Sequence, residues 1–218
     1  MKRVAFILAT ALVVCGVMNV SASHPSANTG EWKTYNIEVG NQIVSFMAPL
    51  GESADYPEFT VPKHVVIDRQ GVFNSVNSGP DLLIRHWDYR KNRFETIYGT
   101  LSANIHLYRS SIVIRNTDDL LAAVKQNDRL DIERRTVDLG RPVFADSIVR
   151  ADIVKVADRN ALLVDYKVTR GIYYVPLDAD HYLSISIDAS GVTQPGWHED
   201  AQAAADAMLR SIRIELRQ

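Results

Sequence analysis

The chain has 218 residues, with 24 basic and 26 acidic side chains, a formal net charge of −2 and a single cysteine. This charge balance, without a basic run longer than two residues, lacks the electrostatic footprint of a nucleic-acid-binding protein. One cysteine cannot form a disulfide within the chain, so the fold must be stabilised by its core, and this length usually forms one domain.

The N-terminus has the three parts of a secretory signal peptide. Lys2 and Arg3 precede an apolar run of about 15 residues, which is shorter than the roughly 20 residues needed to span a bilayer as a helix. Val20-Ser21-Ala22 then offers small side chains for cleavage. We therefore expect residues 1–22 to be a signal peptide, and the mature protein to be periplasmic or secreted, with no integral membrane segment.

Cys15 leaves a second interpretation open. The stretch from Leu12 to Gly16 is similar to a bacterial lipobox, which would make Cys15 a lipidation site and the protein a lipid-anchored envelope protein. A lipobox has a small residue before the cysteine, whereas this chain has Val14. Cleavage after Ala22, which removes Cys15, is therefore the favoured interpretation.

The first half of the chain predicts hairpins and a long loop. Residues 23–30 are polar and predict a flexible segment before a single domain over residues 31–218. Apolar and polar residues then alternate on both sides of Gly40-Asn41, which predicts a hairpin that Pro49 ends. Asn, Ser and Gly dominate residues 70–81, which predicts a long loop.

A second hairpin is predicted after that loop, turning at Lys91-Asn92, with one or two further strands over residues 104–115. A helix should begin near Asn116 or Thr117, whose side chains can cap free amides ahead of two acidic residues.

The second half of the chain predicts an antiparallel meander and a closing helix. In four runs, apolar and polar residues alternate as is typical of strands. Very short connections join these runs, and such connections permit only antiparallel neighbours. These runs cover residues 147–156, 161–168, 172–178 and 181–188. Leu162, Val164, Tyr166 and Val168 share one face, which we expect the helix over residues 198–212 to cover. A short strand then closes the sheet.

The predicted fold is α+β, a largely antiparallel sheet covered by a central and a C-terminal helix. The hairpin "YNIEVGNQIVSFMAP", the meander and the helix running into "LRSIRI" resemble the PsbP-like α/β/α sandwich, which includes DcrB-type bacterial envelope proteins. That resemblance implies an exported, non-enzymatic binding or accessory protein, and some periplasmic immunity proteins are built similarly. It carries over no functional residues.

Aromatic residues concentrate in one third of the chain and could line a surface for a ligand or partner, although core and cross-strand packing is the favoured explanation for them. The candidates are Trp87, Tyr89, Phe94, Tyr98 and Tyr108. If a site exists, we expect it near the loop from Gly71 to Asp81 and the adjacent hairpin.

Acidic residues offer a second, weaker candidate site. Asp178 and Asp180, with Glu199, could contribute oxygen ligands to calcium, although they do not follow the EF-hand pattern. His86, His106 and His181 lie in predicted strands and could converge on a metal, but ordinary partly buried or surface histidines are the favoured explanation. We therefore expect no cofactor.

No recognisable catalytic motif occurs in the sequence. We expect an exported protein that binds another protein and has no enzymatic activity, with an immunity or envelope-accessory role. Two alternatives stay open. One is a metal-dependent or hydrolytic envelope enzyme that uses dispersed His, Asp and Glu residues, and the other is a carrier of a small ligand.

Overall fold

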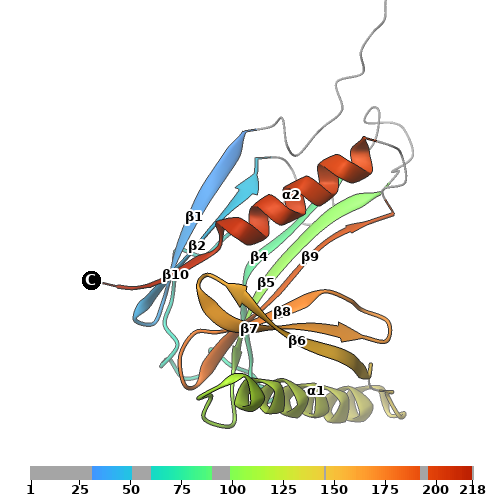
Figure 1. Ribbon diagram of the computed structural model, residues 1–218. Coiled ribbons are helices and arrows are strands. Elements are labelled where there is room, and N and C mark those ends of the chain that lie inside the picture. Colours follow the sequence, from blue (N-terminus) through green and yellow to red (C-terminus); the bar gives the residue numbers. More distant parts are fainter. Residues whose placement is uncertain (1–30, 51–59, 90–98, 145, 192–195, 218) are drawn as a thin grey trace, which may run out of the picture.

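The fold is α+β, as the sequence predicts. The computed structural model describes residues 31–50, 60–89, 99–144, 146–191 and 196–217. Within these ranges the chain forms two sheets and two helices (Figure 1). The predicted signal peptide, its cleavage site and Cys15 lie outside the described residues.

The smaller sheet has the strand order β10-β2-β1-β3. Its strands are β1 (Trp32–Val39), β2 (Gln42–Pro49), β3 (His64–Val65) and β10 (Arg213–Leu216). The predicted hairpin is confirmed, because β1 and β2 are antiparallel with Val39 opposite Gln42 across a two-residue turn. Gly40 adopts a φ of 59°, and a Cβ there would lie 2.5 Å from Ile67 Cδ1, so the turn needs glycine.

The larger sheet is antiparallel and has the strand order β4-β5-β9-β8-β7-β6. Its strands are β4 (Ser78–Asp88), β5 (Thr100–Arg109), β6 (Ile148–Val156), β7 (Arg159–Tyr166), β8 (Ile172–Pro176) and β9 (His181–Ser190). The last four form the predicted meander. The predicted turn at Lys91-Asn92 lies outside the described residues, and β4 pairs with β5.

Two helices cover different parts of these sheets. α1 (Thr117–Leu139) packs against β7 and β8, whereas α2 (Trp197–Ser211) packs against β2, β5 and β9 and so joins the two sheets (Figure 1). The expectation that the C-terminal helix covers Leu162, Val164, Tyr166 and Val168 is therefore wrong. The first three side chains pack with α1, because the face they share lies opposite α2, and Val168 is exposed.

Two strand assignments also differ from the prediction. The segment predicted as a loop up to Asp81 already contains the start of β4 at Ser78, where pairing with β5 overrides the loop-like composition. The closing strand β10 pairs with β2 rather than with the meander. Both differences reflect contacts with strands far away in the sequence, which local composition does not report.

Buried residues form two clusters on opposite faces of the larger sheet. Neighbouring residues divide between them: Tyr182 belongs to the cluster under α1 and Leu183 to the cluster under α2. This division follows from the alternation of side chains along a strand.

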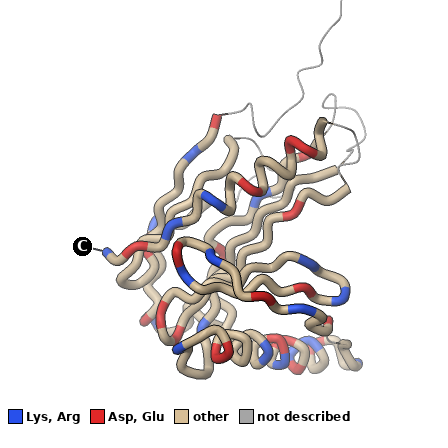
Figure 2. The backbone as a smooth tube through the Cα atoms, in the orientation of Figure 1, with Lys and Arg blue, Asp and Glu red and all other residues tan. Residues whose placement is uncertain are grey.

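In the part of the chain that the structure covers, neither helix is long and apolar enough to cross a membrane. α1 carries charges of both signs along its length (Figure 2).

Candidate functional site: a Ser-His-Asp relay beside a tyrosine-lined cavity

Three polar side chains come together where β4 begins beside β5. Ser78 lies opposite Tyr108 and Asp81 lies opposite His106, with an irregular register between the two pairs. Two positions three apart in a regular strand point to opposite faces. The irregularity removes that constraint, so Ser78 and Asp81 both reach His106.

Hydrogen bonds connect these three residues in a chain. Ser78 Oγ lies 2.7 Å from His106 Nε2, and His106 Nδ1 lies 2.7 Å from Asp81 Oδ1. A carboxylate accepts, so Nδ1 donates to Asp81, and in a neutral imidazole Nε2 then accepts from the serine hydroxyl. The side chains of His106 and Asp81 are 17% and 32% exposed. We call this group the relay. Its residues follow the order of a Ser-His-Asp triad, in which the hydroxyl donates to Nε2 and Nδ1 donates to the carboxylate.

The backbone around Ser78 is held from several sides. Asn74 Oδ1 accepts from the N–H groups of Val76 and Ser78, and Asn74 N–H donates to the Ser78 carbonyl at 2.9 Å. Asn77 has a φ of 61°, in the left-handed region that few residues other than glycine adopt. A Cβ on Gly79 would lie 2.9 Å from the Leu107 carbonyl oxygen, so the serine is followed by a position that needs glycine.

A cavity of about 120 Å³ lies beside Ser78. Its wall consists of Ser78 with two residues of the preceding loop, three tyrosines, and four residues on one side of α1. These are Asn74, Val76, Tyr108, Tyr174, Tyr182, Asn127, Asp128, Asp131 and Arg134. The cavity therefore places a serine hydroxyl, two carboxylates and a guanidinium around one small space.

Tyrosine rings join the relay to the buried cluster under α1. The Tyr108 ring lies 4.6 Å from the His106 ring and stacks on Tyr182 at 5.3 Å, measured between centroids. Burial, with the nearby carboxylate of Asp128, raises the pKa of Tyr108 to about 12. Tyr108 is therefore a neutral phenol at physiological pH.

Asp128 accepts a hydrogen bond from the Tyr166 hydroxyl at 2.8 Å. Tyr166 is in turn 2.8 Å from the Tyr174 hydroxyl, which must donate because the Tyr166 proton points to Asp128. Burial raises the pKa of Asp128, and this bond only partly offsets it. The cavity thus has a half-buried carboxylate at the end of a short chain of phenols.

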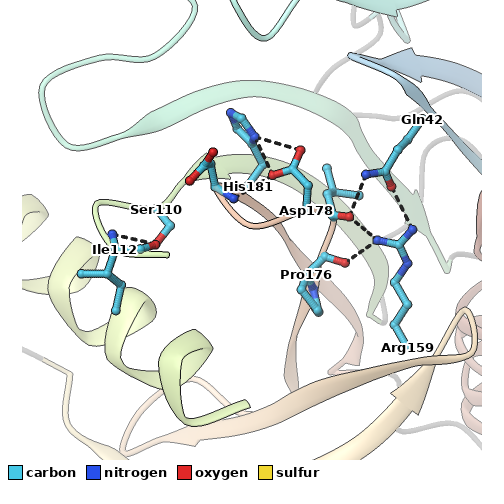
Figure 3. Close-up of polar contacts among 9 residues, drawn as sticks. Gln42, Ser110, Ile112, Arg159, Pro176, Asp178 and His181 are labelled. Atoms are coloured by element: carbon cyan, nitrogen blue, oxygen red, sulfur yellow. Dashed lines mark hydrogen bonds and ion pairs between the residues drawn. The ribbon is translucent and has the colours of Figure 1, made fainter. Parts of the chain in front are cut away.

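A separate polar cluster joins the two sheets (Figure 3). Arg159 on β7 donates to Gln42 Oε1 on β2 at 2.9 Å and to the carbonyls of Pro176 and Leu177. Gln42 Nε2 also donates to the Leu177 carbonyl, at 2.7 Å. Because carbonyls and an amide take up these donors, we assign the cluster a structural role.

His181 and Asp178 form a second histidine–carboxylate pair in the turn between β8 and β9, with His181 Nδ1 2.9 Å from Asp178 Oδ1 (Figure 3). Burial raises the pKa of Asp178, but the hydrogen bonds from His181 and the Asp180 N–H outweigh it and hold the pKa below its usual value. The nearby Ser110 hydroxyl bonds to Ile112 and not to His181, so within the described residues no hydroxyl is hydrogen-bonded to this pair.

The predicted aromatic residues separate in the structure. Tyr108 borders the cavity, whereas Trp87 and Tyr89 are buried in the cluster under α2 and present no binding surface. Phe94 and Tyr98 lie outside the described residues. Both side chains belong to the buried cluster that includes Trp197 of α2, and the centroid of the Tyr89 ring lies 6.2 Å from that of Trp197.

The predicted calcium ligands serve other contacts. Asp178 and Asp180 lie in the β8–β9 turn, whereas Glu199 accepts a hydrogen bond from Gly196 N–H at the start of α2. Among the described residues, no three His, Cys, Asp or Glu side chains gather in an arrangement that could hold a metal ion.

The sequence indicated the loop from Gly71 to Asp81 and named His106, but it did not identify Ser78 and Asp81 as partners of that histidine. The only signal was the cluster of Asn, Ser and Gly, because the serine and the carboxylate match no known motif.

Comparisons with protein-family models, curated proteins and solved structures found no match for this chain.

Proposed function

We propose that this protein is a serine hydrolase that cleaves carboxylic esters through an acyl-enzyme at Ser78. The observation that carries the proposal is the relay, with both of its hydrogen bonds at 2.7 Å beside a cavity that borders the serine. The sequence favours a non-enzymatic protein, and this geometry favours the hydrolytic alternative.

The relay supplies the groups that ester cleavage needs. Ser78 Oγ attacks the ester carbon while His106 Nε2 takes its proton, and the tetrahedral intermediate collapses by expelling the alcohol, which takes that proton. Water then attacks the acyl-enzyme by the same route and releases the acid. Asp81 holds the imidazole in the required tautomer and stabilises its charged form.

Arg134 is the group we assign to the developing oxyanion. Its guanidinium borders the same cavity as Ser78 and donates to Asp131 Oδ1 at 2.8 Å, which orients it. A positioned cation at this point stabilises the negative charge of the intermediate more than that of the neutral ester.

Ser78→Ala tests this function directly. We expect the purified protein to hydrolyse p-nitrophenyl acetate and a fluorophosphonate to label Ser78, as located by mass spectrometry. The variant should lose the label and at least about 10³-fold in kcat/KM. Ser102→Ala, which changes a β5 serine outside the relay, should keep both. Equal hydrolysis by wild type and Ser78→Ala would overturn the proposal.

A second proposal, binding of another protein in the bacterial envelope, has separate support. Several large apolar side chains are exposed on β6, on the connection after β7, and near the end of α1. They are Val137, Leu139, Phe144, Val149, Ile153 and Val168. β6 is also an edge strand, so one side of its backbone has no neighbouring strand among the residues that the structure describes. Such a surface suits a partner that adds a strand.

Ile153→Lys tests this second proposal, because it puts a charge at the middle of β6. A partner captured from envelope extract by residues 23–218 should bind at least about tenfold less to the variant, whereas Ser102→Ala should bind normally. Capture of the same proteins by Ile153→Lys and wild type would contradict it.

Export and a relationship to PsbP-like envelope proteins stay proposals that rest on the sequence. Mass spectrometry of the mature N-terminus tests export. A chain starting at Ser23 supports cleavage after Ala22, whereas a diacylated Cys15 would replace it with a lipid anchor.

A further inference from the structure

Asp128 is a carboxylate of the cavity that has no cationic partner among the described residues. Its hydrogen-bond partner is the neutral Tyr166 hydroxyl, at 2.8 Å. Burial raises its pKa, and the carboxylates of Asp131 and Asp146 add to that effect. The ionised form of this half-buried carboxylate is therefore poorly compensated in the folded chain, and a bound cation would supply the missing compensation.

The other charges of the cavity are paired. Asp131 lies 2.8 Å from Arg134 Nη2 and 3.7 Å from Arg135 Nη1, while Arg134 also lies 3.8 Å from Asp138. The charges that border the cavity are Asp128, Asp131 and Arg134, so the lining carries a net charge of −1. Asp128 is the source of that uncompensated charge.

The cavity is small. Its volume of about 120 Å³ is somewhat below the roughly 150 Å³ of a protein cavity that holds benzene. A group of about the size of a short acyl chain fits in such a space. Tyr108, Tyr174 and Tyr182 border the same space and offer aromatic surface, which attracts cations.

We infer that the ester cleaved at Ser78 has a short acyl group ending in a primary ammonium, such as glycyl, and that Asp128 binds this ammonium. This inference rests on the proposed hydrolase function. Ser78 and Asp128 border the same cavity, so a short acyl group held at Ser78 Oγ can direct its ammonium toward the opposite charge of Asp128. The substrate class is therefore esters of the smallest amino acids.

A pair of isosteric esters tests the inference in turnover. Glycine ethyl ester and ethyl propionate differ in the ammonium, which a methyl group replaces. We expect Asp128→Asn to lower the ratio of their kcat/KM values about tenfold relative to wild type. The amide keeps the acceptor for Tyr166 and removes only the charge. Glu133→Gln, on the same helix but outside the cavity, should leave the ratio unchanged.

Binding to the Ser78→Ala variant gives a readout that needs no turnover. Calorimetry should detect glycine ethyl ester but not ethyl propionate, and adding Asp128→Asn should weaken the binding about tenfold. Equal ratios in wild type and Asp128→Asn, with both esters hydrolysed, would overturn the inference and leave the hydrolase intact. Charge-dependent binding without Ser78-dependent hydrolysis would instead overturn the hydrolase and leave Asp128 as an ammonium site.

Discussion

At the scale of single residues, Asp128 shows how a binding site can oppose stability. Its ionised form loses part of its hydration under the tyrosines and receives one neutral hydrogen bond in return. The pKa in the folded chain is therefore above that of the unfolded chain, about 3.9. A group with a raised pKa favours folding below the unfolded pKa, and this contribution is lost as the pH rises through the folded pKa.

Asp128→Asn should therefore raise the melting temperature at pH 7, by no more than a few degrees. The difference from wild type should shrink as the pH falls and vanish below about pH 4, where Asp128 is protonated in both states. Calorimetric melting curves between pH 3 and pH 8 measure it. Glu133→Gln, which removes an exposed charge, should show no such trend, and a destabilised Asp128→Asn at pH 7 would contradict the argument.

At the scale of elements, α1 forms one wall of the cavity and has defined ends. Asn116 Oδ1 accepts from the N–H groups of Asp118 and Asp119, both at 2.9 Å, and Gly140 ends the helix with a φ of 61°. The start at Asn116 or Thr117 was predicted, because capping depends on neighbouring residues in the sequence. The helix buries only a narrow stripe, so its caps matter for its stability.

Asn116→Ala should lower the free energy of unfolding by about 1 kcal/mol, because two amides at the helix start lose their acceptor. Urea unfolding measures this loss. Asn116→Asp keeps the acceptor oxygen and places a negative charge at the positive end of the helix, so it should retain wild-type stability. Equal losses for the two variants would show that the cap does not explain the effect.

At the scale of the whole molecule, the larger sheet couples two buried clusters. Trp32, Trp87 and Trp197 pack in the cluster on the α2 side, and they are the only tryptophans of the chain. Leu120 on α1 is fully buried in the other cluster. Strands β7, β8 and β9 contribute residues to both clusters, so loss of one cluster removes support from the other.

Leu120→Ala should therefore destabilise the α2 side as well as its own. We expect a loss of about 2–5 kcal/mol, seen as a lower urea midpoint in tryptophan fluorescence with an unchanged slope. Far-UV circular dichroism should report the same midpoint if the clusters unfold together. An unchanged tryptophan transition beside an earlier loss of helix would show two independently unfolding parts.

The sequence by itself determined the features that depend on neighbouring residues. These are the α+β class, the hairpin around Gly40, the start of α1 at Asn116 and the antiparallel meander. Alternation of apolar residues defines which side chains share a face, and short connections define which strands are neighbours.

Only the tertiary structure decided which element covers each face and which polar residues meet. Alternation assigns Leu162 and Tyr166 to one face but contains no information about whether α1 or α2 packs on it. Ser78, Asp81 and His106 meet because an irregular register between β4 and β5 brings Ser78 and Asp81 to the same histidine. The relay therefore depends on pairing between strands about 25 residues apart, and neither strand shows it alone.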